Sequence, residues 1–255
     1  MKKETIDNDQ KKLIDSLVKY YIDNKRLLLV LLNQVEISVS SSPKLRPPLI
    51  HSVKFRLKDP DHLRDKLKRK MLEANEKGKR FTVTTKNLFS KINDLAGFRI
   101  IHLHTTQFQE IDIELKNIFK EQAWVLHEGP IARTWDDEYR EYFGKIGTSV
   151  NKSPDLYTSV HYIIKANSDN PLTCEIQVRT LMEEVWGEVD HTINYPYKSK
   201  SHSCREQIKV LARVTSSSSR LVDSIFSTHK DFHENATRQK TKQKEIIKTK
   251  AKNKK

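Results

Sequence analysis

The sequence predicts an α+β fold, in which a mixed sheet is flanked by helices, and two observations carry this prediction. Residues 172–180 alternate apolar side chains with polar ones that include Glu175, Gln177 and Arg179. A period of two is typical of a strand with one buried and one polar face. Residues 91–126 then predict a turn and strand, a helix and a second strand, the order expected of a mixed sheet.

The first 48 residues predict a helical arm and a linker. Residues 11–33 place leucines and tyrosines at the spacing of a long amphipathic helix. Residues 38–48 are rich in serine and proline, which predicts a linker that ends this helix. We therefore expect residues 1–48 to dock beside the central sheet and not to form part of it.

The next segment predicts a phosphate site. Residues 50–57 alternate apolar with basic side chains, and Asp59 followed by proline supplies the start of a helix. Helix N-terminal amides and cationic side chains converge where a strand meets such a helix, which favours phosphate binding. We expect Arg56 and Lys58 to serve this function, whereas the basic residues 68–70 are expected to form a solvated helix face.

Asp94 precedes a segment that is apolar on both faces, which is typical of a central strand. Its carboxylate could hold a divalent metal ion, and Gly97 permits a close approach of the backbone. An aspartate at this position is also a common turn former, so both interpretations stay open.

Residues 128–155 are polar and contain glycines and prolines, and we expect them to form a long loop that is either functional or disordered. The loop leads into a predicted strand at residues 156–164, which places Tyr157 and His161 on one face. Tyr157 could pack in the core or offer its ring to a flat base. The histidine could reach a phosphate.

A helix is predicted after Thr180. Its four-residue spacing predicts core positions at Leu181, Val185, Val189 and Ile193, beside Met182 and Trp186. The other faces would then carry Glu183, Glu184, Glu188, Asp190 and His191. Residues 201–237 predict one or two further helices, and the lysine-dense residues 238–255 predict a frayed, disordered tail.

Composition limits the class of protein. The longest apolar run, residues 27–32, is far shorter than the roughly 20 residues of a membrane span. Two cysteines provide neither a disulfide framework nor a zinc spacing, so a cytoplasmic protein without a membrane segment is expected. The net charge of +14 favours a polyanionic partner, but does not separate nucleic acid from a nucleoside polyphosphate.

Five motifs in order resemble the RelA/SpoT alarmone synthetase domain over about residues 49–200. They are Arg56-x-Lys58, Asp94-Leu-Ala-Gly-Phe-Arg99, Tyr157-x-Ser-x-His161, Glu175-Ile-Gln-Val-Arg-Thr180 and Glu183-Glu-Val-Trp-Gly-Glu-Val-Asp-His191. The resemblance implies a nucleotidyltransferase-like, five-stranded mixed sheet. It also implies transfer of the ATP β,γ-pyrophosphate to the 3′-hydroxyl of GDP or GTP, with Mg²⁺, to give ppGpp or pppGpp.

The resemblance further implies a role for each matching residue. Asp94 would hold Mg²⁺, and Glu175 would assist the metal and act as general base. The residues implied for the donor nucleotide are Arg56, Lys58, Lys66 and Arg99. On the acceptor side, Tyr157 would stack on the base and His161 would lie near the phosphates, with Gln177 and Arg179 in support.

The sequence also departs from the family pattern. Pro154-Asp-Leu-Tyr-Thr-Ser replaces the frequent Asn-Gly-Tyr-Arg-Ser, and His62 stands where a small hydroxyl residue is common. Without hydrolase or regulatory domains, the chain resembles the small stand-alone synthetases, which associate through flanking helices, so a homo-oligomer is expected.

Two alternatives remain open. One is a toxic pyrophosphokinase that modifies the tRNA 3′ end or adenine nucleotides. The other is a non-catalytic RNA-binding or nucleotide-sensing module. Asp94 and Glu175 argue against the second, because a pure polyanion binder gains nothing from acidic groups in its site.

Overall fold

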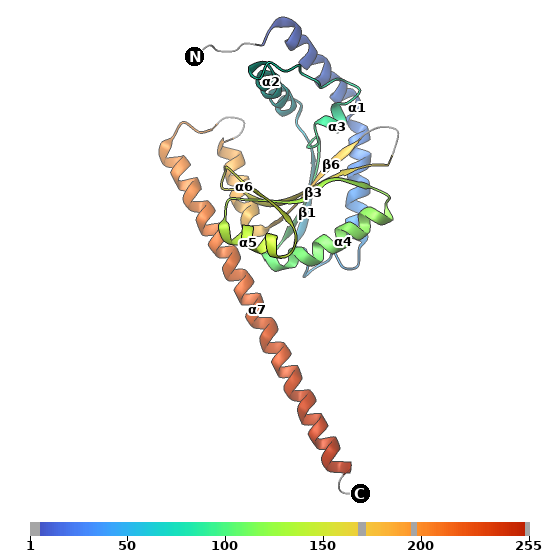
Figure 1. Ribbon diagram of the computed structural model, residues 1–255, viewed down its shortest axis with the longest axis vertical. Coiled ribbons are helices and arrows are strands. Elements are labelled where there is room, and N and C mark those ends of the chain that lie inside the picture. The colour runs from blue at the N-terminus through green and yellow to red at the C-terminus, as the bar shows by residue number, and fades with distance from the viewer. Residues whose placement is uncertain (1–5, 168–171, 195–197, 253–255) are drawn as a thin grey trace.

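The computed structural model describes residues 6–167, 172–194 and 198–252 and contains one six-stranded mixed sheet (Figure 1). The strand order is β1-β2-β6-β5-β3-β4. Strand pairs β2/β6 and β3/β4 are parallel and the other neighbours are antiparallel. The strands are β1 (Ser52–Leu57), β2 (Ala96–His102), β3 (Val125–Thr134), β4 (Ser149–Lys152), β5 (Thr158–Lys165) and β6 (Thr173–Thr180).

Helices cover both faces of this sheet, as predicted. The apolar side chains of β6, including Ile176 and Val178, join the main core with residues of α1 and α4, whereas α6 lies against the opposite face (Figure 1). The helices are α1 (Asn8–Ser41), α2 (Pro60–Glu76), α3 (Leu88–Lys91), the 3₁₀ turn η1 (Thr105–Gln107), α4 (Phe108–Glu121), α5 (Asp137–Lys145), α6 (Leu181–Asn194) and α7 (His202–Lys252). No helix in the described ranges is long and apolar enough to cross a membrane.

The prediction of a long loop at residues 128–155 is wrong, because this segment contains most of β3 and all of α5 and β4. Gly129 has a φ of 98° at a register shift inside β3, so this glycine marks a bulge within a strand. An added Cβ there would lie 2.3 Å from the carbonyl oxygen of His161. The sheet gains a sixth strand because β4 pairs with β3.

Two helix boundaries also differ from the prediction. Helix α1 continues to Ser41, into the predicted linker, because Val35 and Val39 extend its buried stripe by two more turns. Helix α7 runs to Lys252, through most of the segment predicted to fray. Lysine is the most frequent residue of that segment, which also contains two glutamines, and both residue types have high helix propensity.

Candidate active site

A cleft of about 590 Å³ lies between the polar face of the sheet and α6. It is lined by seven of the predicted site residues, namely Arg56, Asp94, Arg99, Tyr157, Glu175, Gln177 and Arg179. Lys58, Lys66 and His161 do not line it, but each contacts a residue that does. The strand register explains this convergence, since Gly97 of β2 pairs with Glu175 of β6 and thereby brings the residues flanking β2 to the same end of the site.

Glu175 is held by neighbours on two sides. His161 Nδ1 lies 3.0 Å from one carboxylate oxygen, and Gln177 donates a hydrogen bond of 3.0 Å to the other. Burial raises the pKa of Glu175, but the hydrogen bond and charge of His161 and the Gln177 amide outweigh it despite the charge of Asp94, so the pKa is lowered. The carboxylate is therefore anionic at neutral pH, which suits a metal ligand.

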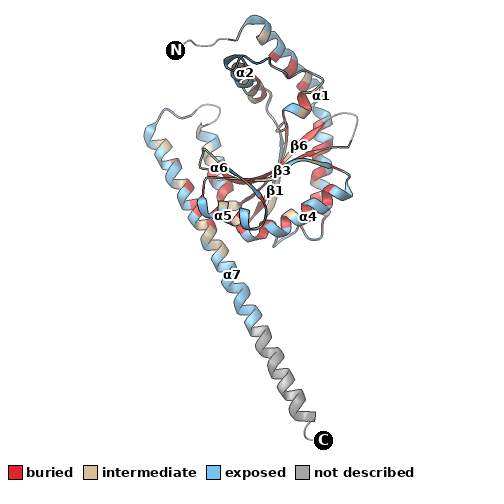
Figure 2. Cartoon of the chain, viewed as in Figure 1, coloured by how far each residue is buried: buried red, intermediate tan, exposed pale blue. Residues whose placement is uncertain are grey.

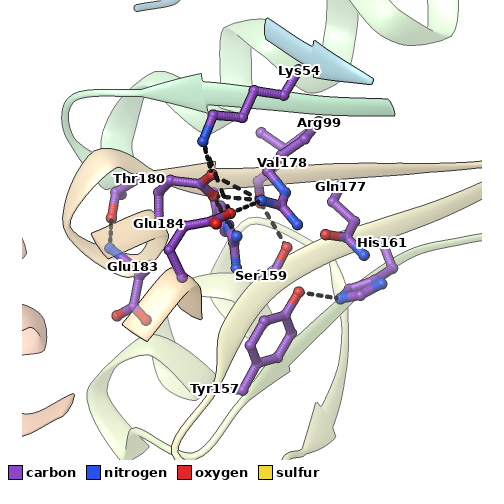
Figure 3. Close-up of polar contacts among 12 residues, drawn as sticks. Lys54, Arg99, Tyr157, Ser159, His161, Gln177, Val178, Thr180, Glu183 and Glu184 are labelled. Atoms are coloured by element: carbon purple, nitrogen blue, oxygen red, sulfur yellow. Dashed lines mark hydrogen bonds and ion pairs between the residues drawn. The ribbon is translucent and has the colours of Figure 1, made fainter. Parts of the chain in front are cut away.

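His161 connects Glu175 to Tyr157. Its Nε2 lies 3.2 Å from the Tyr157 hydroxyl (Figure 3). Because a carboxylate only accepts, Nδ1–H donates to Glu175, while Nε2 faces the Tyr157 hydroxyl. The structure thus places His161 behind Glu175 and not on the cleft wall, as an orienting group for the carboxylate.

Tyr157 forms a half-buried wall of the cleft. Its ring packs near Trp186, with centroids 6.3 Å apart, and near the Arg179 guanidinium, 5.9 Å from the centroid. Burial is the main cause that raises the pKa of its hydroxyl. The ring is therefore a neutral aromatic surface, which suits contact with a flat base.

Asp94 shows one satisfied and one orphaned oxygen. Lys58 and Lys66 donate to Oδ2 over 3.0 and 2.7 Å, and these charges lower the pKa of Asp94 although burial acts to raise it. The other oxygen, Oδ1, is buried and has no hydrogen-bond partner among the described residues. A buried carboxylate oxygen without a hydrogen-bond partner can coordinate a cation that binds together with a substrate phosphate.

A divalent cation would not find a complete protein cage here. Within the described ranges, no group of three or more His, Cys, Asp or Glu side chains could hold a metal ion. Mg²⁺, however, commonly uses only one or two carboxylates and takes its other oxygens from water and phosphate. Asp94 and Glu175 fit that donor set.

Glu184 is the central member of a buried ionic cluster that the sequence did not predict. Its carboxylate accepts from Lys54 over 2.9 Å and from Arg99 over 2.8 Å (Figure 3). It also accepts from Arg179 Nε over 2.5 Å. Burial would raise the pKa of Glu184, but the surrounding cations, Arg179 foremost, lower it to about 2. Glu184 therefore fixes three cations that come from three different strands.

The cluster overturns the predicted core face of α6. Glu183 and Glu184 are only 3% and 4% exposed, whereas Val185 and Ile193 are 46% and 39% exposed. Trp186 is buried as predicted. The helix is rotated from the expected orientation because pairing Glu184 with the cations outweighs burial of the two aliphatic side chains.

The charge of the cleft is mixed. Four cations, Lys54, Arg56, Arg99 and Arg179, line it together with the carboxylates of Asp94, Asp155, Glu175, Glu188 and Asp190. Arg56 is exposed and makes no ion pair among the described residues, so its charge is open to a ligand. Lys54 could have been found from the sequence, because it alternates with Arg56 on the same strand face.

A second cavity of about 730 Å³ lies between α1 and α4. Its lining includes Glu114 and Glu121 but neither lysine nor arginine, nor any predicted site residue. It cannot neutralise phosphate, so the smaller cleft is the site for an anionic substrate.

A family model described as a region found in RelA / SpoT proteins matches residues 55–200. The fold resembles the crystal structure of small alarmone synthetase 1 from Bacillus subtilis, with a TM-score of 0.56 and 14% sequence identity over 85% of this chain and 99% of that chain. The crystal structure of that protein bound to AMPCPP gives a TM-score of 0.52 and 14% identity over 84% and 98%. Comparison with curated protein sequences found no match.

The matched segment runs from within β1 past the end of α6, and therefore includes the other five strands and every residue that lines the cleft except Lys54. It covers more than half of the chain and every predicted site residue. The chain belongs to the RelA/SpoT family.

Proposed function

We propose that the protein is a GTP/GDP pyrophosphokinase, which transfers the β,γ-pyrophosphate of ATP to the 3′-hydroxyl of GDP or GTP. The observation that supports this most is the pair of carboxylates, Asp94 and Glu175, in a cleft whose other walls carry arginines and an aromatic ring. Family membership supports the same reaction class.

The donor nucleotide is assigned to the side of the cleft formed by β1 and α2. Arg56 offers an exposed guanidinium there, and Lys58 and Lys66 flank Asp94. Arg99 adds a guanidinium held in place by Glu184. The structural relative bound to AMPCPP supports a nucleoside triphosphate as donor.

Asp94 and Glu175 are assigned to Mg²⁺. The ion would neutralise charge that develops on the phosphoryl oxygens. Its arrival would also satisfy the orphaned Asp94 oxygen. Lys58 and Lys66 now neutralise the Asp94 carboxylate through its other oxygen. Once the cation takes over that charge, both lysines could turn toward phosphate.

The acceptor is assigned to the Tyr157 side, where the base would lie against the ring and Arg179 would meet phosphate. Gln177 and His161 hold Glu175, which is the candidate proton acceptor. The acceptor oxygen attacks the β-phosphorus of ATP, the bond from that phosphorus to the α,β-bridging oxygen breaks, and AMP leaves. The hydroxyl proton passes to Glu175.

One experiment tests both the reaction and the acceptor. The purified chain is incubated with γ-labelled ATP, Mg²⁺ and one of GDP, GTP, ATP or deacylated tRNA. Label in a guanosine 3′-diphosphate product is expected. Label only in an adenine nucleotide or in tRNA would assign the acceptor differently, and no transfer to any of them would contradict the enzyme proposal.

A tRNA acceptor is the second candidate, and exposed basic residues on and after α2 favour it. They are Lys68, Arg69, Lys70, Lys77, Lys79 and Arg80. Helix α2 borders the cleft, because its Lys66 contacts Asp94. Binding of tRNA through this surface should weaken with salt in proportion to the phosphates contacted, whereas mononucleotide binding should depend on salt only weakly.

We also propose self-association through the flanking helices. Four apolar side chains of α7, Val210, Val214, Leu221 and Ile225, are each more than half exposed. An exposed apolar stripe on a long helix favours contact with another helix.

A further inference from the structure

We infer that His229 and His233 form a binding site for a single transition-metal cation. The two residues lie one turn apart on α7, in a segment where the side chains are exposed (Figure 2). Residues four apart on a helix lie on the same face, and their side chains therefore point in the same direction. The site shares no residue with the cleft, so this inference does not depend on the proposed function.

The distance between the rings suits chelation. Nε2 of His229 lies 3.1 Å from Nε2 of His233, and the ring centroids are 4.4 Å apart. If a cation lies at the usual zinc–nitrogen distance from both atoms, the N–metal–N angle is about 100°. That angle lies between octahedral and tetrahedral values, so one ion fits without a rearrangement of the helix.

The ligand type selects the metal. Neutral imidazole nitrogen favours Zn²⁺, Ni²⁺ or Cu²⁺, whereas Mg²⁺ prefers oxygen. Paired histidines at this spacing on a helix are an established zinc-binding arrangement. The site would therefore not compete for the ion assigned to Asp94 and Glu175.

The two histidines provide part of a coordination shell. The described ranges contain no third His, Cys, Asp or Glu side chain placed to complete a metal site with them. Water would occupy the other positions on the exposed helix face. The bound ion would link two successive turns of α7 in the exposed part of the helix, which extends away from the body of the protein (Figure 1).

Isothermal titration of the full chain with ZnCl₂, in buffer with excess Mg²⁺, tests the site. One Zn²⁺ per chain should bind to the wild type. Substitutions His229→Ala and His233→Ala should each weaken this binding roughly tenfold or more, because a two-point chelate becomes a single ligand. His202→Ala, at the start of the same helix, is the matched control and should bind as the wild type does.

Two outcomes would overturn the inference. One is a wild type that binds Zn²⁺ no more tightly than the double variant His229→Ala/His233→Ala. The other is equal loss of binding in the His202→Ala control. Acidification provides an independent check, since protonation of the imidazoles should abolish the binding. Circular dichroism of each variant verifies that α7 remains helical, so that lost binding is not mistaken for an unfolded helix.

Discussion

At the scale of single residues, the site depends on how Glu175 is held. Its two oxygens are occupied by His161 and Gln177, which leaves the anionic group oriented by a hydrogen-bonded chain that begins at Tyr157. The lowered pKa keeps the Glu175 carboxylate anionic, which suits both a metal ligand and the candidate acceptor of the hydroxyl proton. Its proposed contribution therefore combines charge, position and acceptance of that proton.

Glu175→Gln should leave folding intact and reduce pyrophosphate transfer by about 10²-fold or more, because the amide keeps the shape but loses the charge. The measurement is the initial rate with labelled ATP, together with the midpoint of urea unfolding. Glu121→Gln, on α4 and away from the cleft, is the control. Undiminished turnover in Glu175→Gln would reject the assigned role.

Tyr157→Ala should raise the KM for the acceptor much more than the KM for ATP, because the ring is assigned to the acceptor base. Tyr157→Phe retains the ring and loses the hydroxyl that contacts His161 and Ser159, so its acceptor KM should stay near the wild-type value. Steady-state kinetics with each substrate varied in turn provides the comparison. Equal changes in both KM values for the alanine variant would contradict the stacking assignment.

At the scale of elements, α6 positions the cations of the sheet. Glu184 accepts from Arg179, and Gly187, almost one turn later, leaves room for the same guanidinium. A Cβ at residue 187 would lie 2.5 Å from Arg179 Nη1. Since Arg179 is buried and held by Glu184, it cannot move aside without breaking that pair.

Gly187→Ala should therefore destabilise the protein by about 1–3 kcal/mol and lower activity, because the new methyl group displaces Arg179. Gly144→Ala in α5 is a matched control, because no atom of the described residues outside its own stretch of helix lies within 4 Å of the added Cβ. That control should be neutral or should stabilise by about 0.5–1 kcal/mol, since alanine favours helix. Urea unfolding measures both, and equal effects would show that Gly187 has no packing role.

The pKa of Glu183 is shifted in the opposite direction to that of its neighbour Glu184. Burial, its largest influence, raises its pKa from 4.5 to about 8 despite the charge of Arg179. The folded state then holds the proton more tightly than the unfolded state. The contribution of Glu183 to stability is consequently complete below pH 4.5 and decreases as the pH rises to about 8.

Glu183→Gln removes this titration. The variant should gain stability relative to the wild type as the pH is raised from about 5 to about 8. Urea unfolding at both ends of this interval gives the difference, and Glu76→Gln, an exposed change on α2, should show no such trend. A difference that stays constant with pH would show that Glu183 is already charged in the folded protein.

At the scale of the whole molecule, α7 stands out because most of its length does not pack on the rest of the protein (Figure 1). Its N-terminal half packs on α6 through Ile208 and Ala212, which contact Trp186 in the wall of the cleft. The remainder extends away from the body (Figure 1). Helix α7 therefore contacts the wall of the cleft with one face and presents its exposed apolar side chains on another, so an assembly formed through α7 would lie next to the cleft.

Leu221→Lys combined with Ile225→Lys should dissociate the proposed oligomer, because two charges would enter the apolar stripe. Sedimentation equilibrium of the wild type should give a multiple of the chain mass, and the double variant should give the monomer. Lys230→Glu changes a charged, exposed position on the same helix and should leave assembly unchanged. A monomeric wild type would contradict the proposal.

The sequence by itself determined five of the six strands, most of the buried stripe of α1 and seven of the residues that line the cleft, because period-two and helical patterns depend only on which side chains are apolar. Position in the chain, however, cannot show which strands become neighbours. The sixth strand, the place of His161 behind Glu175 and the burial of Glu183 and Glu184 were decided by tertiary structure. For Glu184 the physical reason is electrostatic, because Lys54, Arg99 and Arg179 from three separate strands meet its buried carboxylate.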